Sequence, residues 1–249
     1  MDHQPKEEWL EIKTDYHKKQ FDTPYRSTVL FCKWLEQKGL LNVHDQQAIL
    51  DIGAGQGANL NYMAKQFPQC TFTGIDLNES LVNQGNSYFQ DHHMSNCRLL
   101  QGDLYCLDPS HIGKYEGVVS YQTLSWLPEY ETPLKKMMEL NAEWIALTSL
   151  FFDGDVDCTV TVKDYTQSIG GENFRQSYYN IYSLNRVKEF CRQHGYTRFE
   201  SVPFEIDIDL PKPDSMGMGS YTERLADGRR LQISGPVWMS WHFVCAQKE

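Results

Sequence analysis

Three acids and three glycines in the first half of the chain have the types and spacing that could hold a ligand. The stretch ILDIGAGQGANL at 49–60 places Asp51 just before glycines at alternate positions, and Asp76 and Asp103 follow in FTGIDLNES and LLQGDL. Glycines let the backbone turn tightly and approach a ligand closely. Carboxylates attract cations and accept hydrogen bonds from hydroxyl groups. The pattern therefore predicts a site for a ligand that needs both a bare backbone and carboxylates.

These residues need a strand–loop–helix scaffold, which the apolar and glycine- or proline-rich segments predict. Strands are expected at 48–52, 71–75, 97–100, 117–121, 144–151, 197–206 and 237–246. Helices are expected at 27–38, 57–67, 78–89, 131–140 and 183–194, with Ser27, Asn78 and Ser183 as N-caps. The alternation predicts an α/β fold with a doubly wound sheet of about seven mostly parallel strands, a C-terminal antiparallel strand, an N-terminal helical cap and inserted loops.

The chain is expected to form one domain, because its 249 residues suffice for one substantial core. Within it, 1–45 would form the helical cap, 46–151 the ligand-binding core, and 152–249 the substrate-side insertions and C-terminal strands. The segments 152–182 and 207–236 do not follow the strand–helix alternation. They are expected to be loops that recognise a substrate.

Composition restricts the partners and the compartment. The net charge of −10 and pI near 5.3 argue against a nucleic-acid partner, since such binding depends on Lys and Arg contacts to phosphate. No apolar run approaches the roughly 18 residues of a membrane span, and the first residues are too polar for a signal peptide, so a cytoplasmic protein without a membrane partner is expected. The seven cysteines include no CxxC pair, which favours reduced thiols. We predict no metal site, and the oligomeric state stays open.

Asp51 distinguishes two possible ligands. The string from Gly53 to Ala58 fits a dinucleotide fingerprint, and Asp76 follows at the distance of a ribose-binding acid. However, a carboxylate about 5 Å from a pyrophosphate charge would cost roughly 3 kcal/mol at an effective dielectric of about 20. S-adenosylmethionine brings a cationic sulfonium and an amino group instead, while Asp76 could bind its ribose hydroxyls and Asp103 its adenine amino group. Three acids at successive strand ends favour this methyl donor.

With these motifs, residues 49–125 resemble class I S-adenosylmethionine-dependent methyltransferases, which have a Rossmann-like fold. The resemblance implies that the acid–glycine loop holds the methionine moiety, that Asp76 binds ribose with Leu77 beside the adenine, and that Gly102-Asp103-Leu104 is the third motif. The donor-binding residues expected in this region are Asp51, Gly53, Ala54, Gly55, Gly57, Asp76, Leu77, Asp103, Leu104, Tyr121 and Gln122. The stretch YQTLSWLPEY departs from the family, because Gln122 and Ser125 stand where many relatives carry the histidines of an HxLxH pattern. No catalytic base is therefore assigned.

Two further segments resemble methyltransferases. PYRST at 24–28 is similar to an N-terminal element that lies over the donor in some relatives, which implies that Arg26 binds the methionine carboxylate and Tyr25 covers the ligand. The stretch GSYTERLADGRRLQISGPVWMSWHF at 219–243 faintly resembles bacterial methyltransferases associated with surface-polysaccharide synthesis.

The expected activity is in-line methyl transfer to a small-molecule acceptor that is anionic or sugar-linked, with catalysis dominated by positioning. Arginines suit an anionic group and aromatic residues suit a sugar or base. The acceptor-binding candidates are Trp126, Arg175, Tyr178, Tyr179, Tyr182, Arg229 and Arg230. Structural roles compete with these assignments: the acids can cap helices, the aromatic residues can pack in the core, and the arginine pair can lie in a solvated turn. Two other functions stay open, an NAD-type nucleotide-dependent oxidoreductase and a non-catalytic donor-binding module.

Overall fold

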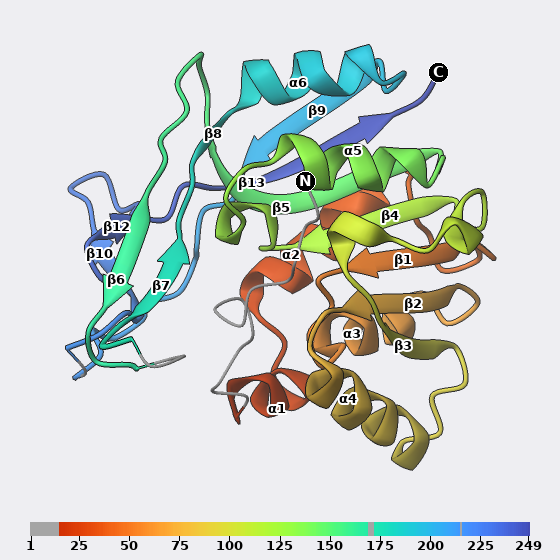
Figure 1. Ribbon diagram of the computed structural model, residues 1–249, viewed down its shortest axis with the longest axis horizontal. Coiled ribbons are helices and arrows are strands. Elements are labelled where there is room, and N and C mark those ends of the chain that lie inside the picture. The colour runs from red at the N-terminus through yellow and green to blue at the C-terminus, as the bar shows by residue number, and fades with distance from the viewer. Residues whose placement is uncertain (1–14, 169–171, 215) are drawn as a thin grey trace.

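A mixed sheet forms the centre of the protein in the computed structural model, which describes residues 15–168, 172–214 and 216–249 (Figure 1). Its strands are β1 (Ala48–Ile52), β2 (Thr71–Asp76), β3 (Cys97–Gln101), β4 (Gly117–Tyr121), β5 (Trp144–Phe152), β8 (Tyr182–Ser183), β9 (Arg198–Pro203) and β13 (Trp241–Gln247). The order is β3-β2-β1-β4-β5-β13-β9, with β8 paired to the end of β5. Only β13 runs antiparallel to its neighbours β5 and β9, so the predicted sheet is confirmed.

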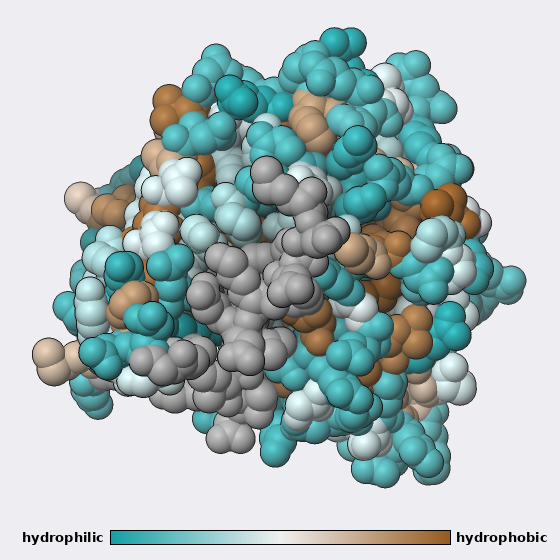
Figure 2. Space-filling view, in the orientation of Figure 1, coloured by the Kyte–Doolittle hydropathy of each residue, from teal (hydrophilic) through white to brown (hydrophobic). Residues whose placement is uncertain are grey.

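Helices cover both faces of this sheet (Figure 1). They are α1 (Asp15–Asp22), α2 (Arg26–Gln37), α3 (Ala58–Gln66), α4 (Glu79–Asp91), α5 (Glu131–Glu139) and α6 (Leu184–Gln193). One core layer packs α2, α3 and α4 on the sheet through side chains such as Leu35, Met63 and Phe89. The other packs α5 and α6 through Met137 and Val187. The outer face of α6 is hydrophilic (Figure 2), as expected for an amphipathic helix on one side of a buried sheet.

Two of the three predicted helix N-caps are present in the structure. Asn78 accepts hydrogen bonds from the N–H groups of Ser80 and Leu81 at the start of α4, and Ser183 accepts one from Arg186 at the start of α6, so both predicted caps are confirmed. The cap predicted at Ser27 is wrong. Helix α2 already begins at Arg26, after Tyr25, and Ser27 is buried within its first turn.

Two small sheets occupy the segments that were expected to be loops. One contains β6 (Thr161–Asp164) and β7 (Arg175–Tyr178), which pair antiparallel. The other contains β10 (Ser220–Arg224), β11 (Arg230–Ser234) and β12 (Val237–Trp238) in that order. These strands are short, and most of their residues are only partly buried or exposed, so they carry no strong apolar alternation that would reveal them in the sequence. A break after β12 also divides the single strand expected at 237–246.

The small sheets lie beside the end of β5 and away from β1–β3 (Figure 1). A separate apolar cluster joins them to the main sheet, with Leu150, Tyr179, Met239 and Trp241 as its buried members. Short 3-10 helices complete the described elements: η2 (Leu104–Cys106), η3 (Pro109–His111) and η4 (Leu124–Trp126). Because η4 follows β4 and packs against β7, it lies where the main sheet meets the β6–β7 hairpin.

Candidate donor and acceptor site

A cavity of about 470 Å³ opens at the carboxyl ends of β1, β2 and β4. The strand order reverses between β1 and β4, and such a switch point is where open α/β sheets bind ligands. The volume is within the range of about 300–1,000 Å³ that is typical of small-molecule pockets. Thirteen residues predicted from the sequence line it: Tyr25, Gly53, Ala54, Gly55, Asp76, Leu77, Asp103, Leu104, Tyr121, Gln122, Trp126, Arg175 and Tyr179.

The glycine loop after β1 is a close-fitting backbone turn. Gly53 has φ +76°, and a Cβ atom there would lie 2.4 Å from the Thr123 hydroxyl. Gly57 has φ +79° and precedes α3, where a Cβ atom would meet the Phe89 ring at 2.7 Å. Gly57 does not line the cavity, so its role is to let the loop pack against α4. Both positions require glycine, for the backbone conformation and for space.

Asp76 ties this loop to the next strand. Its Oδ2 atom accepts a hydrogen bond of 2.7 Å from the Gly55 N–H, and its Oδ1 atom accepts one of 2.9 Å from the Asn78 N–H. The loop is also held by the N–H groups of Gly53 and Ala54, which donate to the Ile75 carbonyl. The Asp76 carboxylate therefore shapes the cavity floor and lines the cavity at the same time.

Asp51 lies behind the cavity lining. Its side chain is fully buried, and neither carboxylate oxygen has a hydrogen-bond partner. Burial raises its pKa well above the usual value, and the charge of Asp76 raises it further. The charge of Asp51 in turn raises the pKa values of Cys32, on α2, and of Tyr121, on β4. Direct contact between Asp51 and a cationic ligand was expected from the sequence, but the structure places Tyr121 in the lining and Asp51 beyond it.

Asp103 and Gln122 line other walls of the cavity. Asp103 accepts a hydrogen bond of 2.9 Å from the Tyr105 N–H and thereby caps η2, so the structural role considered for it is present. Gln122 has φ +56°, an uncommon conformation for a residue with a side chain. Its N–H donates to the Thr148 carbonyl at 2.9 Å, which holds this conformation at the end of β4. Such local strain is characteristic of ligand-binding positions.

The N-terminal helices contribute lining residues that sequence reasoning missed. Gln20, Ser27 and Thr28 line the cavity, and the Thr28 hydroxyl donates to Asn59 Oδ1 at 2.7 Å. Arg26, by contrast, does not line it. The Arg26 guanidinium binds the Asp207 carboxylate, with Nε 2.9 Å from Oδ1.

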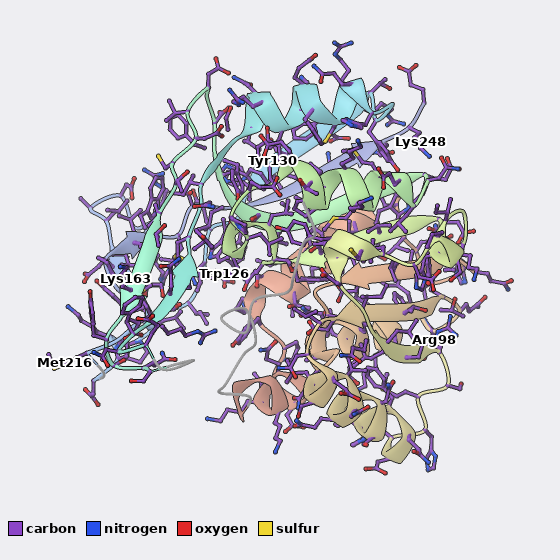
Figure 3. The ribbon with its side chains drawn as sticks, in the orientation of Figure 1. Arg98, Trp126, Tyr130, Lys163, Met216 and Lys248 are labelled. Atoms are coloured by element: carbon purple, nitrogen blue, oxygen red, sulfur yellow. The ribbon has the colours of Figure 1, made fainter. Side chains whose placement is uncertain are left out.

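On the acceptor side, the β6–β7 hairpin brings Arg175 to the cavity, and Tyr179 follows directly after β7. Trp126 lies between this hairpin and the central sheet (Figure 3). The centroid of its ring is 4.2 Å from the centroid of the Tyr179 ring. Sequence reasoning missed Asp164, Gln167, Ser177 and Met218, which line the same part of the cavity. No local motif marks them, because the hairpin itself was not predicted.

Four predicted acceptor residues are not brought to the cavity. Tyr178 is absent from its lining. Tyr182 is buried, and its hydroxyl lies 3.3 Å from the Leu124 carbonyl. Arg229 pairs with Asp227, and Arg230 pairs with Asp209. The arginine pair follows a turn, as the structural interpretation of ADG suggested, because Gly228 has φ +86°.

The described residues meet the requirements neither of a metal site nor of a membrane-spanning helix. Among them, no group of three or more His, Cys, Asp or Glu side chains could hold a metal ion. None of the helices in the described part of the chain combines the length and apolar character needed to cross a membrane.

Residues 49–142 match the protein family described as "Methyltransferase domain", and this stretch holds the glycine loop, Asp76 and Asp103 of the cavity. The region is a class I S-adenosylmethionine-dependent methyltransferase domain. The malonyl-[acyl-carrier protein] O-methyltransferase of Priestia megaterium is 24% identical over 168 residues, which are 64% of this chain and 57% of that protein. The chain spans between 31% and 57% of the first curated relatives that it matches.

Solved structures share the fold of this methyltransferase domain. Magnesium protoporphyrin IX methyltransferase from Synechocystis PCC 6803, with bound S-adenosylhomocysteine, superposes with a TM-score of 0.55 at 13% identity and covers 97% of this chain and 91% of its own. The 1,6-didemethyltoxoflavin-N1-methyltransferase of Burkholderia thailandensis gives a TM-score of 0.54 at 14% identity and covers 94% of this chain and 84% of its own. At these identities the likeness concerns the fold.

Proposed function

We propose that the chain transfers the methyl group of S-adenosylmethionine to a small-molecule acceptor. The observation that carries the proposal is the continuity of the cavity, which joins the glycine loop and Asp76 of the methyltransferase domain to Arg175 and Trp126 at the β6–β7 hairpin. The donor end has a loop without side chains and a carboxylate, and the other end has a guanidinium and aromatic rings. Both substrates of a transfer reaction could therefore meet within one cavity.

The residues present fit the donor. Gly53 and Gly55 leave the loop bare of side chains, and a Cβ atom at Gly53 would overlap Thr123. Asp76 would hold the ribose hydroxyls and Asp103 the adenine amino group. The Asp51 carboxyl behind the lining has no hydrogen-bond partner, and a cationic ligand at the floor would stabilise its ionised form. When bound, the donor supplies an electrophilic methyl group on its sulfonium.

Acceptor activation in this cavity depends on positioning. Its described lining contains no histidine, and the carboxylate on the acceptor side is Asp164. Burial would raise the pKa of Asp164, but hydrogen bonds from Thr166, Met218 and Gln167 outweigh this and lower it. A carboxylate stabilised in this way is a poor proton acceptor. The residues around Trp126 would therefore orient an acceptor whose nucleophile needs no enzyme base, and proximity would supply most of the rate enhancement.

The two other functions considered from the sequence receive less support. An NAD-type oxidoreductase is not favoured, because residues 49–142 match a methyltransferase domain and the characterised relatives that the chain matches are methyltransferases. A donor-binding module without catalysis would have no use for the cavity beyond the donor end, yet that part is lined by Arg175, Ser177 and Tyr179.

The experiment is a transfer assay with donor labelled in its methyl group. We expect wild-type protein to move label into members of a small-molecule library, and the Asp76→Ala variant to lose this transfer. Calorimetry with the donor and with S-adenosylhomocysteine provides the binding readout. An absence of binding to both compounds would refute the proposed function, and binding without any transfer would favour the non-catalytic module.

A further inference from the structure

Arg175 contributes the positive charge of the cavity. Among the described lining residues it is the sole lysine or arginine side chain. Its Nε atom is buried without an acceptor, and its Nη1 atom reaches only the Gln167 side-chain oxygen at 3.5 Å. A guanidinium has five N–H donors, so most of the donors of Arg175 are unused in the described structure. A buried N–H donor such as Nε is unfavourable unless a ligand accepts its hydrogen bond.

The arginines that come near the C-terminal insertions show the contrast. Arg26 pairs with Asp207, Arg224 and Arg230 both pair with Asp209, and Arg229 pairs with Asp227. The chain has a net charge of −10, so carboxylates are plentiful, and six of its nine arginines form an ion pair with one within the described residues. Within the described residues, Arg175 has no carboxylate within ion-pair distance. Arg98 and Arg198 form no ion pair there either, but of these three arginines only Arg175 lines the cavity.

Asp164 lies opposite Arg175 in the β6–β7 ladder, but it has other partners. Oδ1 accepts from the N–H and the hydroxyl of Thr166 at 2.9 and 2.6 Å. Oδ2 accepts from the Gln167 amide at 3.1 Å and from the Met218 N–H at 3.2 Å. The Met218 bond joins the hairpin to the segment before β10, and the other three lie within the turn that follows β6. All four donors are neutral. Asp164 therefore shapes the acceptor end of the cavity and leaves the guanidinium available.

We propose that Arg175 binds a carboxylate of the acceptor, so that the substrate of this site is a small carboxylic acid. The proposal rests on the proposed methyl transfer and specifies its acceptor. A guanidinium matches a carboxylate in charge and in planar geometry. A phosphate dianion would bring a second negative charge into a cavity already lined by Asp76, Asp103 and Asp164. One arginine among these acids therefore favours a monoanion.

The surroundings of Arg175 suit the rest of such a molecule. Trp126, Tyr179 and Met218 provide apolar surface in the same part of the cavity, and Ser177 offers a hydroxyl beside them. The Tyr179 and Trp126 rings meet edge to face, with an interplanar angle of 87°, so both are fixed by packing. The carbon skeleton of the acid would lie against these side chains while Arg175 orients its charged end. Arg175 is thus a specificity-determining residue.

The test uses a library of small aliphatic and aromatic carboxylic acids, each paired with its primary amide, and donor labelled in the methyl group. We expect label in one or more acids and at least about tenfold less in the matching amides, since each lost charged hydrogen bond weakens recognition by about this factor or more. For an accepted acid, Arg175→Gln should raise KM by about 10- to 100-fold with a smaller change in kcat. Arg175→Lys should recover part of the loss, because it restores the charge without the planar geometry.

Two controls separate this proposal from the proposed function. Donor affinity measured by calorimetry should be the same in wild type and Arg175→Gln, and Arg192→Gln on the exposed face of α6 should leave KM unchanged. The carboxylic-acid proposal is overturned if no acid accepts label, if acids and amides accept it equally, or if Arg175→Gln keeps the wild-type KM. Donor binding together with transfer to neutral acceptors would leave the methyltransferase function standing. Loss of donor binding in wild type would instead remove the proposed function itself.

Discussion

The N–H group of Gly55 donates a hydrogen bond of 2.7 Å to the carboxylate of Asp76, 21 residues further along the chain. The bond links the loop after β1 to the end of β2, and the Asn78 N–H binds the other oxygen of the same carboxylate. Asp76 consequently holds the shape of the donor end before any ligand enters. A preformed site loses less conformational entropy on binding.

Asp76→Ala is expected to weaken donor binding by at least about 10- to 100-fold, because the variant loses both the ligand contacts and the anchor of the loop. Asp76→Asn keeps one oxygen that can accept the Gly55 N–H bond, so its loss should be smaller. Calorimetry with S-adenosylhomocysteine measures both. Equal affinity in wild type and Asp76→Ala would contradict the assignment of Asp76 to the ribose.

Gly53→Ala is expected to destabilise the fold and weaken donor binding, since the new Cβ atom would meet the Thr123 hydroxyl in a left-handed backbone conformation. The matched control is Gly39→Ala, where φ is +69° but no atom lies within 4 Å of the added Cβ. The control should cost only the backbone strain, about 1 kcal/mol. Urea unfolding compares the two variants, and an equal loss would show that the contact with Thr123 is unimportant.

Asp51 predicts a pH dependence of stability. Burial raises its native pKa well above the usual 3.8, so the native protein keeps a proton that the unfolded chain releases. The contribution to the free energy of unfolding is therefore fully present below the usual pKa, and it is lost as the pH rises through the native pKa. Asp51→Asn cannot ionise, so the wild type should become less stable relative to this variant as the pH increases.

Urea unfolding of both proteins at acidic, neutral and alkaline pH measures this difference. Saturating S-adenosylmethionine should reduce the pH-dependent loss in wild type, because its positive charge stabilises the ionised carboxylate. A constant difference between wild type and Asp51→Asn across the pH range would show that Asp51 does not retain its proton.

The ion pair between Arg26 and Asp207 leads to a prediction about donor affinity. The Arg26–Asp207 pair is exposed, with 41% and 49% of the two side chains accessible, so Arg26→Gln should barely change the melting temperature. If the guanidinium leaves Asp207 to bind the methionine carboxylate, Arg26→Gln weakens donor affinity, whereas Asp207→Asn removes the competitor and strengthens it. Thermal shift and calorimetry give both readouts. Identical affinities in the two variants would restrict Arg26 to the surface ion pair.

Local sequence signals were sufficient for the donor end of the fold. The apolar residues of β1, the alternate glycines and the Asn78 cap act over a few residues, and backbone sterics convert them directly into strand, turn and helix. The order of strands and helices then implies a parallel sheet, and the carboxyl edge of that sheet places the loop, Asp76 and Asp103 together. Nine of the eleven donor-binding residues predicted between Asp51 and Gln122 line one cavity for this reason.

Long-range packing determined the remaining features. The burial of Asp51 depends on α2 lying over β1, and the partner of Arg26 is 181 residues away in the chain. The hairpin that brings Arg175 to the cavity forms from two short, half-buried strands, and its position depends on contacts with η4, Met218 and the end of β5. None of these relationships follows from a local period or motif. They depend on which distant segments bury surface against one another and form hydrogen bonds, and this is decided only when the whole chain is folded.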